Sequence, residues 1–203
     1  TSTTATAAAA LPKAGGTMTG NLATAGISAV TAGTSNFVAG VNAGNSITSG
    51  GNYNTTVGDE AGTAITTGDN NTAVGQDALK STTTADHNTA VGQAALYTNT
   101  TGATNTAVGR ASMYANTTGT SNTAVGYAAL NTNTTGNVNT AIGYQALLSN
   151  TTGWGNLALG NSTLDANTTG IKNIAVGGAS LSANTTGNQN VAVGYNSLLA
   201  NTT

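Results

Sequence analysis

The chain has no cysteine, a single proline, and very few charged or aromatic residues. Charged residues make up 5% of its 203 residues and aromatic residues 4%, whereas a soluble domain usually carries about 25% charged residues. Without cysteine the chain forms neither disulfide bonds nor thiolate metal sites. The composition therefore excludes a disulfide-stabilised scaffold, and the stability of the fold must come from another source.

Positive charge and long apolar runs are also scarce. The chain has four Lys and Arg residues in all and a net charge of −2. These are too few cations to neutralise a run of phosphates, so we expect no binding to nucleic acid. No apolar run approaches the ~20 residues that cross a bilayer, so we expect no membrane insertion. The segment 7–11 lacks the basic start and the length of a signal peptide.

What the chain does contain is a repeat of fixed period. An asparagine recurs at constant spacing and without insertion, at Asn54, Asn71, Asn88 and onward to Asn190. When each copy is numbered from this asparagine, position four is Val, Ile or Leu, position five is Gly, and position nine is usually Leu. Positions twelve to fifteen mostly read Asn-Thr-Thr-Gly. Two copies show these repeat-defining residues: Asn71, Val74, Gly75 and Leu79, and Asn139, Ile142, Gly143, Leu147, Asn150 and Gly153. A fixed short period indicates a stacked array rather than a globule.

The repeat predicts an all-β fold, a parallel β-solenoid or β-roll with one 17-residue coil per copy. Positions two to four are mostly strand formers in alternation, and we expect a second short strand over positions eight to thirteen. The glycines at positions five and fifteen are expected to turn the chain through positive φ. A helix is disfavoured because the Asn-Thr-Thr-Gly breaker leaves no stretch of ~12 residues for it.

The pattern also predicts what each position does in the stack. The asparagines at positions one and twelve are expected to form ladders along the stack. Val at position four and Leu at position nine are expected to fill the coil, while the Ala at position three faces a partner chain. Two large apolar residues contribute little against the entropy of ordering a coil, so we expect an assembly of chains, a homotrimer.

Three regions follow from the composition. Residues 1–22 form an N-terminal linker or attachment segment, residues 23–53 are irregular initial or capping coils, and residues 54–203 are the repeat shaft. The segment 11–22, which reads LPKAGGTMTGNL, closely resembles a segment found in many bacteriophage tail-fibre proteins. The resemblance implies a virion protein of the tail fibre that contacts other tail or baseplate proteins. A plain glycine-rich linker is the alternative.

A second resemblance recurs through 54–203. Asn-Thr-Ala-Val-Gly and Asn-Thr-Ala-Ile-Gly are similar to the Asn-Ser-Val-Ala-Ile-Gly motif of trimeric autotransporter adhesin heads, although that family's usual repeat is shorter. The resemblance implies a homotrimer of left-handed parallel β-rolls that binds host surfaces. Repeats with the same core also resemble those of phage tail fibres that carry a self-cleaving chaperone domain.

The residues predict no catalytic, metal or cofactor site and no enzyme activity. His87 is the only histidine, so no second imidazole or thiolate completes a metal site or a triad, and we expect it to be a solvated turn residue. Asp59 and Glu60 are adjacent and are expected to be surface charges rather than an acid and base pair. Asn-x-Ser/Thr triplets match the glycosylation sequon, but the repeat itself explains where these asparagines stand.

Aromatic residues occupy the variable positions of the repeat, where they either contact other molecules or pack on neighbouring coils. Exposed aromatics often stack on sugar rings, so host-surface glycans are candidate partners. The candidate contact residues are Tyr97, Tyr114, Tyr127, Tyr144, Trp154 and Tyr195.

The function that fits these features best is a structural fibre, a phage tail-fibre shaft that supports host-surface attachment. The alternative is a bacterial extracellular adhesin or filament subunit, located at the cell surface, built from the same solenoid. An ice-binding solenoid is disfavoured because the Thr-Thr pairs are adjacent and split between faces. A polysaccharide-cleaving solenoid enzyme is disfavoured because no acid and base cluster exists.

Overall fold

A computed structural model describes residues 32–203. The predicted attachment segment, 1–22, and residues 23–31 of the predicted initial region lie outside the described residues. The described chain is built from short strands, one in each coil. The strands are β1 Phe37–Ala39, β2 Thr55–Val57, β3 Thr72–Val74, β4 Thr89–Val91, β5 Thr106–Val108, β6 Thr123–Val125, β7 Thr140–Ile142, β8 Leu157–Leu159, β9 Ile174–Val176 and β10 Val191–Val193.

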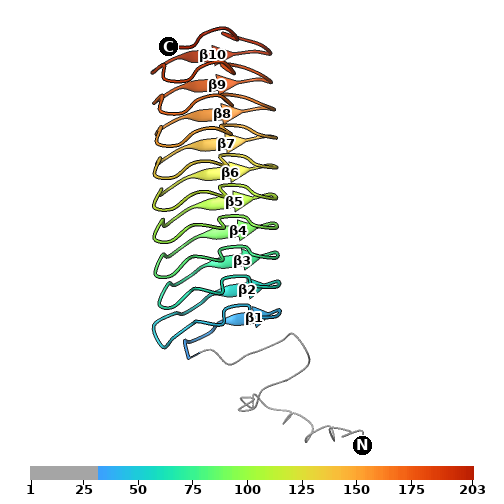
Figure 1. Ribbon diagram of the computed structural model, residues 1–203, viewed down its shortest axis with the longest axis vertical. Helices are drawn as coiled ribbons and strands as arrows, with labels where there is room; N and C mark the ends of the chain where they lie inside the picture. The colour runs from blue at the N-terminus through green and yellow to red at the C-terminus, as the bar shows by residue number, and fades with distance from the viewer. Residues whose placement is uncertain (1–31) are drawn as a thin grey trace, which may run out of the picture.

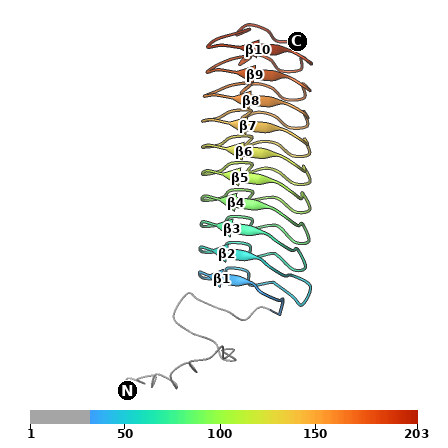
Figure 2. The same ribbon diagram turned by 180° about the vertical axis from the view of Figure 1, so that it is seen from behind.

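The strands form one parallel sheet in sequence order, from β1 to β10. Within the repeat array each residue pairs with the residue one period later, as Thr72 pairs with Thr89 and Val74 with Val91. The coils therefore stack directly above one another, as the views from the front and from behind show (Figures 1 and 2). The predicted all-β fold, a parallel β-solenoid of 17-residue coils, is confirmed.

The first coil belongs to the same stack but is one residue longer. Phe37 of β1 pairs with Thr55 of β2, an offset that exceeds the repeat period by one. The same longer offset holds at Thr48, whose N–H donates to Thr66 O at 2.9 Å. The offset has returned to the regular period at Asn52, whose N–H donates to Asp69 Oδ1 at 2.6 Å. The extra residue therefore lies between Thr48 and Asn52, and the part of 23–53 that the structure describes contains a full coil.

From β3 to β10 the interior of the coil is lined by the alanine of the strand, not by the residue at position four; Val38 of β1 and Thr56 of β2 take the same inward place. Ala73 and Leu79 are both 0% exposed, whereas Val74 is half-buried on the outward side. The prediction that Val fills the coil and Ala faces a partner is therefore wrong in its assignment of sides. The alternation itself is correct, because Thr and Val at positions two and four share one side of the strand and Ala occupies the other.

The rest of the coil is a series of tight turns. The predicted second strand is wrong, since the coils of residues 32–203 contain only the one three-residue strand each. Positions seven, nine and seventeen adopt the left-handed conformation, as at Asp77 (φ 60°) and Leu79 (φ 51°). These reversals bend the chain around the inward Leu side chain, which is fully buried. The conformation costs a residue with a Cβ atom about 1–2 kcal/mol, so stacking must offset it in every coil.

Both predicted asparagine ladders are present. At position one, Asn71 Nδ2 donates to Asn54 Oδ1 at 3.1 Å and to Ala85 O at 2.8 Å. At position twelve, Asn150 Nδ2 donates to Asn133 Oδ1 at 2.9 Å and to Gly153 O at 3.0 Å. All these asparagines are buried. Each amide therefore binds the coil before it and its own coil, and it satisfies backbone carbonyls that water cannot reach.

Glycine occupies positions five and fifteen of the repeat for different physical reasons. Gly75 has a φ of 131°, as predicted for a turning residue. Gly153 is not among the positive-φ glycines, so the prediction of a positive φ at position fifteen is wrong. A Cβ there would lie 2.3 Å from Asn150 Oδ1 and 2.4 Å from Gly170 O. In coils with Asn at position twelve, glycine is needed at position fifteen because the asparagine ladder and the next coil approach the backbone too closely for a side chain. Ala85 takes this position in the coil whose position twelve is Thr82.

Candidate functional site

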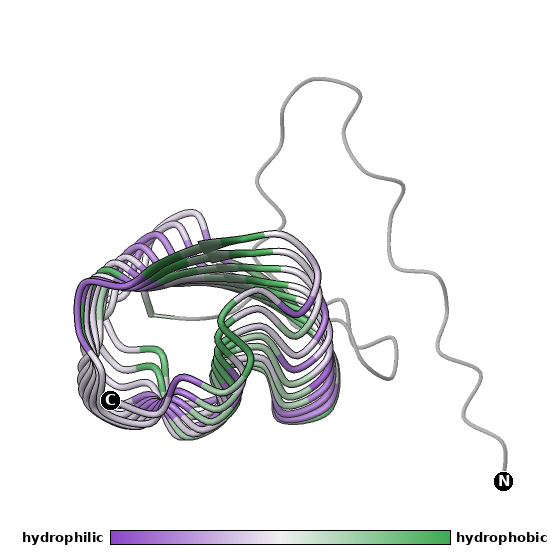
Figure 3. Cartoon of the chain, turned by 90° about the horizontal axis from the view of Figure 1, so that it is seen from above, coloured by the Kyte–Doolittle hydropathy of each residue, from purple (hydrophilic) through white to green (hydrophobic). Residues whose placement is uncertain are grey.

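The outward face of the sheet is an uncharged surface that runs along the stack. It consists of positions two and four of every strand, which read Thr and Val from β3 to β6 and become fully apolar from β8 onward. Leu159 is 42% exposed and Ile174 40% exposed. Seen along the stack, the strands form one wall of the coil, and the hydrophobic colouring follows this wall (Figure 3). This face is the first candidate for contact with another molecule.

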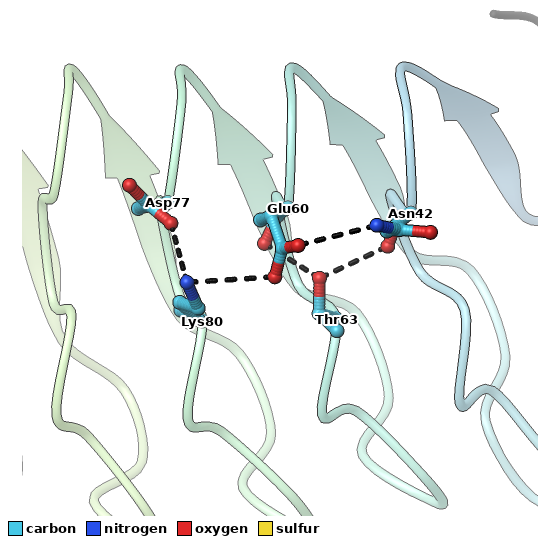
Figure 4. A network of polar contacts seen from close by, with 5 residues as sticks. All are labelled: Asn42, Glu60, Thr63, Asp77 and Lys80. Atoms are coloured by element: carbon cyan, nitrogen blue, oxygen red, sulfur yellow. Dashed lines mark hydrogen bonds and ion pairs between the residues drawn. The ribbon is translucent and has the colours of Figure 1, made fainter.

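A polar network of charged residues lies on the turns of the first coils (Figure 4). Lys80 Nζ lies 2.8 Å from Asp77 Oδ1 and 3.4 Å from Glu60 Oε2. Asn42 Nδ2 donates to Glu60 Oε1 at 3.2 Å, so the network spans three coils. The hydrogen bond with Asp77 is the main cause that raises the pKa of Lys80, and the two carboxylates add to it. The cation occupies the space between the carboxylates and links neighbouring coils.

Asp59 and Glu60 do not form an acid and base pair in the structure. Glu60 forms an ion pair with Lys80 and accepts a hydrogen bond from Asn42, which agrees with its prediction as a surface charge. His87 is exposed, with a φ of 60° in a turn, as predicted. Among residues 32–203, no three His, Cys, Asp or Glu side chains gather closely enough to hold a metal ion.

Tyrosines at equivalent positions of successive coils stack on one another. The rings of Tyr97 and Tyr114 lie 5.0 Å apart with an interplanar angle of 9°, and those of Tyr127 and Tyr144 lie 5.2 Å apart at 12°. The tyrosine rings therefore stack along the same direction as the coils. Such pairs typically add about 0.5–1.5 kcal/mol beyond the area that they bury.

A cation covers the first ring of each tyrosine pair. Lys80 Nζ lies 5.6 Å from the ring centroid of Tyr97, and Arg110 Cζ lies 5.6 Å from that of Tyr127. Both faces of Tyr97 and of Tyr127 are thus occupied by neighbouring coils. A sugar ring stacks on the face of an aromatic ring, so these two candidate residues offer it no free face. Tyr97 and Tyr127 therefore fit the alternative interpretation, in which the aromatic residues pack on neighbouring coils.

Trp154 and Tyr195 are arranged differently. Lys172 Nζ lies 4.8 Å from the Trp154 ring, and its stem crosses Gly155, where a Cβ would lie 3.5 Å from Lys172 Cγ. Tyr195 is 80% exposed and its ring lies over Gly178. With Tyr114 and Tyr144, these two residues are the candidates that keep part of their ring surface open.

The cations Lys80, Arg110 and Lys172 were not predicted as part of any site. The period itself carries the signal for two of them, because Lys80, Tyr97 and Tyr114 follow one another at the repeat spacing, as do Arg110, Tyr127 and Tyr144. Residues one period apart lie directly above one another in a stack of coils. Lys172 lies one position further than a period from Trp154, so the repeat spacing alone does not predict that it covers this ring.

Most of the sequon asparagines are inaccessible. The ladder asparagines that begin Asn-Thr-Thr triplets, such as Asn99 and Asn150, are 0% exposed and hydrogen-bonded within the coil. Among the described sequons, Asn70 and Asn161 have exposed side chains. The geometry therefore explains the recurrence of Asn-Thr-Thr by packing.

The described part of the chain has no helix of a length and hydrophobicity that would cross a membrane. Comparison of the chain with protein-family models, with curated proteins and with solved structures gives no match. The candidate surfaces are therefore interpreted from their own geometry.

Proposed function

We propose that the chain is the shaft of a fibre, a phage tail-fibre protein that assembles as a homotrimer and supports attachment to a host surface. The observation that carries this proposal is the uninterrupted ten-stranded stack. At ~4.8 Å for each strand, ten coils make a rod about 48 Å tall. A rod whose every coil is bound to the next by buried asparagine ladders is suited to holding a receptor-binding part at a distance.

The N-terminal segment 11–22, with its resemblance to tail-fibre proteins, supports this role over other rod functions. In a tail fibre it would join the shaft to other tail or baseplate proteins. The partly open rings of Tyr114, Tyr144, Trp154 and Tyr195 are the residues that would contact host-surface glycans during attachment.

The second candidate is a bacterial extracellular adhesin or filament subunit at the cell surface. It is favoured by the recurrence of Asn-Thr-Ala-Val-Gly through the array, because of the resemblance of this motif to the heads of trimeric autotransporter adhesins. The same solenoid serves either role, so the location of the protein decides between them.

Immunogold electron microscopy with an antibody against the repeat array tests the proposal. We expect labelled fibres on the tails of purified virions. Label confined to the surface of bacterial cells that carry no phage genome would support the adhesin, and absence of label from both would contradict both candidates.

A further inference from the structure

The outward face of the sheet is free of charge along its whole height. Positions two and four of β1 to β10 contain Thr, Val, Ile, Leu, Phe and Ala, and no charged residue. All the ionisable residues described above lie on the turns instead. A surface of this length without one charge is unusual for the exterior of a soluble protein, which normally intersperses charges of both signs.

The apolar character of this face increases along the stack. Strands β3 to β7 carry Thr at position two, whereas β8, β9 and β10 carry Leu157, Ile174 and Val191 there. Their partners at position four are Leu159, Val176 and Val193. No element of residues 32–203 packs over this face, because the other walls of each coil lie on the opposite side of the strand (Figure 3).

The dimensions of the face match those of a contact surface. Three-residue strands present a band ~10 Å wide, and ten strands make it about 48 Å tall, or about 500 Å² in each chain. Functional patches on monomers are commonly about 300–600 Å², and a standard interface buries about 800 Å² of each partner. The face is therefore large enough to direct association but small enough for a single buried charge to disrupt it.

The repeat indicates which partner fits. Rows of outward side chains spaced by one strand separation stay in register over ten coils only against a surface of the same spacing, and this chain provides one. A rotation axis parallel to the stack places each coil opposite the same coil of the other copies, so identical ranks meet. An uncharged face also meets a copy of itself without like-charge repulsion.

We propose that copies of this chain associate through the outward face of the sheet, around an axis parallel to the stack, with β8 to β10 as the most apolar part of the contact. This inference rests on the proposed homotrimeric fibre and identifies the surface that holds it together. In such an assembly positions two and four point toward the axis, and the stacked tyrosine pairs and the charged turns remain outside.

Substitution with lysine tests the surface in the full-length chain. Leu159→Lys places a charge of the same sign from every chain near the axis and is expected to weaken association by at least about a hundredfold. Val138→Lys is the matched control, because Val138 is also an exposed aliphatic residue, 61% exposed, and its position in the repeat carries lysine naturally at Lys172. Light scattering over a concentration series measures the mass of each variant, and far-ultraviolet circular dichroism checks the fold.

A conservative variant provides a second readout. The chain has no cysteine, so a single introduced thiol forms a disulfide only with another copy. Val125→Cys, on β6, is expected to give a disulfide-linked dimer band on a non-reducing gel after mild oxidation, because equivalent residues meet near the axis. Val138→Cys, on the outer turns, is expected to remain unlinked at the same protein concentration.

The outcomes separate this inference from the proposed function. A wild-type mass of three chains that persists in Leu159→Lys, with no Val125→Cys crosslink, overturns the surface and leaves the trimeric fibre in place. A monomeric wild-type mass at all concentrations overturns both the trimer and its surface. Crosslinked Val125→Cys without labelled fibres on virions supports the surface and contradicts the tail-fibre role.

Discussion

Asp165 has a buried carboxyl oxygen, Oδ1, that accepts no hydrogen bond. Burial raises the pKa of Asp165 above its ordinary value, while the backbone N–H groups of Asp165 and Ala166 oppose the rise. Other side chains at the same repeat position donate to the carbonyl of position seven in the preceding coil: Thr63 Oγ1 to Asn42 O at 2.9 Å and Asn131 Nδ2 to Ala111 O at 2.8 Å. The equivalent carbonyl for residue 165 belongs to Gln145.

We therefore expect Asp165→Asn to stabilise the protein at pH 7 by on the order of 1 kcal/mol, by adding a donor toward this carbonyl. The sign of the pH dependence follows from the raised pKa. The folded protein binds the proton more tightly than the unfolded one, so wild-type stability falls as pH rises through the folded pKa. Urea unfolding from pH 4 to pH 8 measures the difference, which should shrink toward acidic pH. A variant that is less stable than wild type at pH 7 contradicts the interpretation.

Thr56 is a second buried residue with an unsatisfied group. Its Oγ1 has no hydrogen-bond partner and the residue is 0% exposed. Thr56→Val keeps the shape and removes the hydroxyl, so we expect the free energy of unfolding to rise by about 1 kcal/mol. Thr163→Val is the matched control, because Thr163 is equally buried but its Oγ1 donates to Gly177 O at 2.8 Å. That variant should lose stability, and equal effects of both substitutions would argue against the assignment.

At the scale of the element, the position-twelve ladder provides the next prediction. Asn150 donates to Asn133 Oδ1 and Gly153 O, and its Oδ1 accepts from Asn167 Nδ2 at 2.9 Å. Asn150→Ala removes these three hydrogen bonds and leaves Asn133 Oδ1 without a partner, whereas Gly153 O keeps the donor Asn139 Nδ2 and Asn167 Nδ2 keeps the acceptor Gly170 O. We therefore expect a loss of about 2–3 kcal/mol in the free energy of unfolding. Exposed Asn161→Ala should change it by less than about 0.5 kcal/mol. Chemical denaturation of both variants measures this difference, and similar losses would exclude the ladder as a major source of stability.

The spacing of the sequence is sufficient to predict the strand, the coil and the ladders, because residues one period apart must stack. It does not by itself decide which side of the strand faces inward, and hydrophobicity favoured valine over alanine. The first copy of the repeat does indicate which side of the strand faces inward. Position three is Thr56 where position nine is Gly62, and a Cβ at Gly62 would lie 2.7 Å from Thr56 Cγ2. Positions three and nine therefore share the interior, where Leu leaves room only for Ala.

The left-handed turns are the feature of the fold that is hardest to predict from the sequence. Glycine and asparagine are the usual signals for positive φ, but positions seven and nine carry residues such as Ala94 and Leu96, with φ of 55° and 52°. These residues read as strand or helix formers in isolation. Only the stacked coils, through backbone bonds such as Leu96 N–H to Ser112 O at 3.0 Å, hold them in this conformation. The aromatic candidates were predicted by position, but the cations that cover their rings depend on the turn geometry.

At the scale of the whole molecule, the fold is a sum of equivalent coils, and stability in such arrays comes from each repeat and its interfaces with its neighbours. This predicts that a complete coil can be removed. Deletion of residues 173–189, which removes β9, brings β8 against β10 with Leu157 facing Val191 and Leu159 facing Val193. Both ladders continue across the junction, since Asn156 then meets Asn190 and Asn167 meets Asn201.

We expect the chain without 173–189 to fold with the same circular dichroism spectrum and to be shorter by one coil, about 4.8 Å, in small-angle X-ray scattering. Deletion of 173–188, one residue fewer, is the matched control. It leaves Gln189 as an extra residue before Asn190 and turns Val191 and Val193 out of line with Leu157 and Leu159 below, because a shift of one residue moves each side chain to the other face. The one-residue insertion in the first coil is accommodated in a turn away from the strand, whereas this one falls directly before the ladder residue Asn190 and β10. The shorter deletion should therefore unfold at a clearly lower temperature, and equal stability of the two deletions would mean that the coils do not depend on a common register.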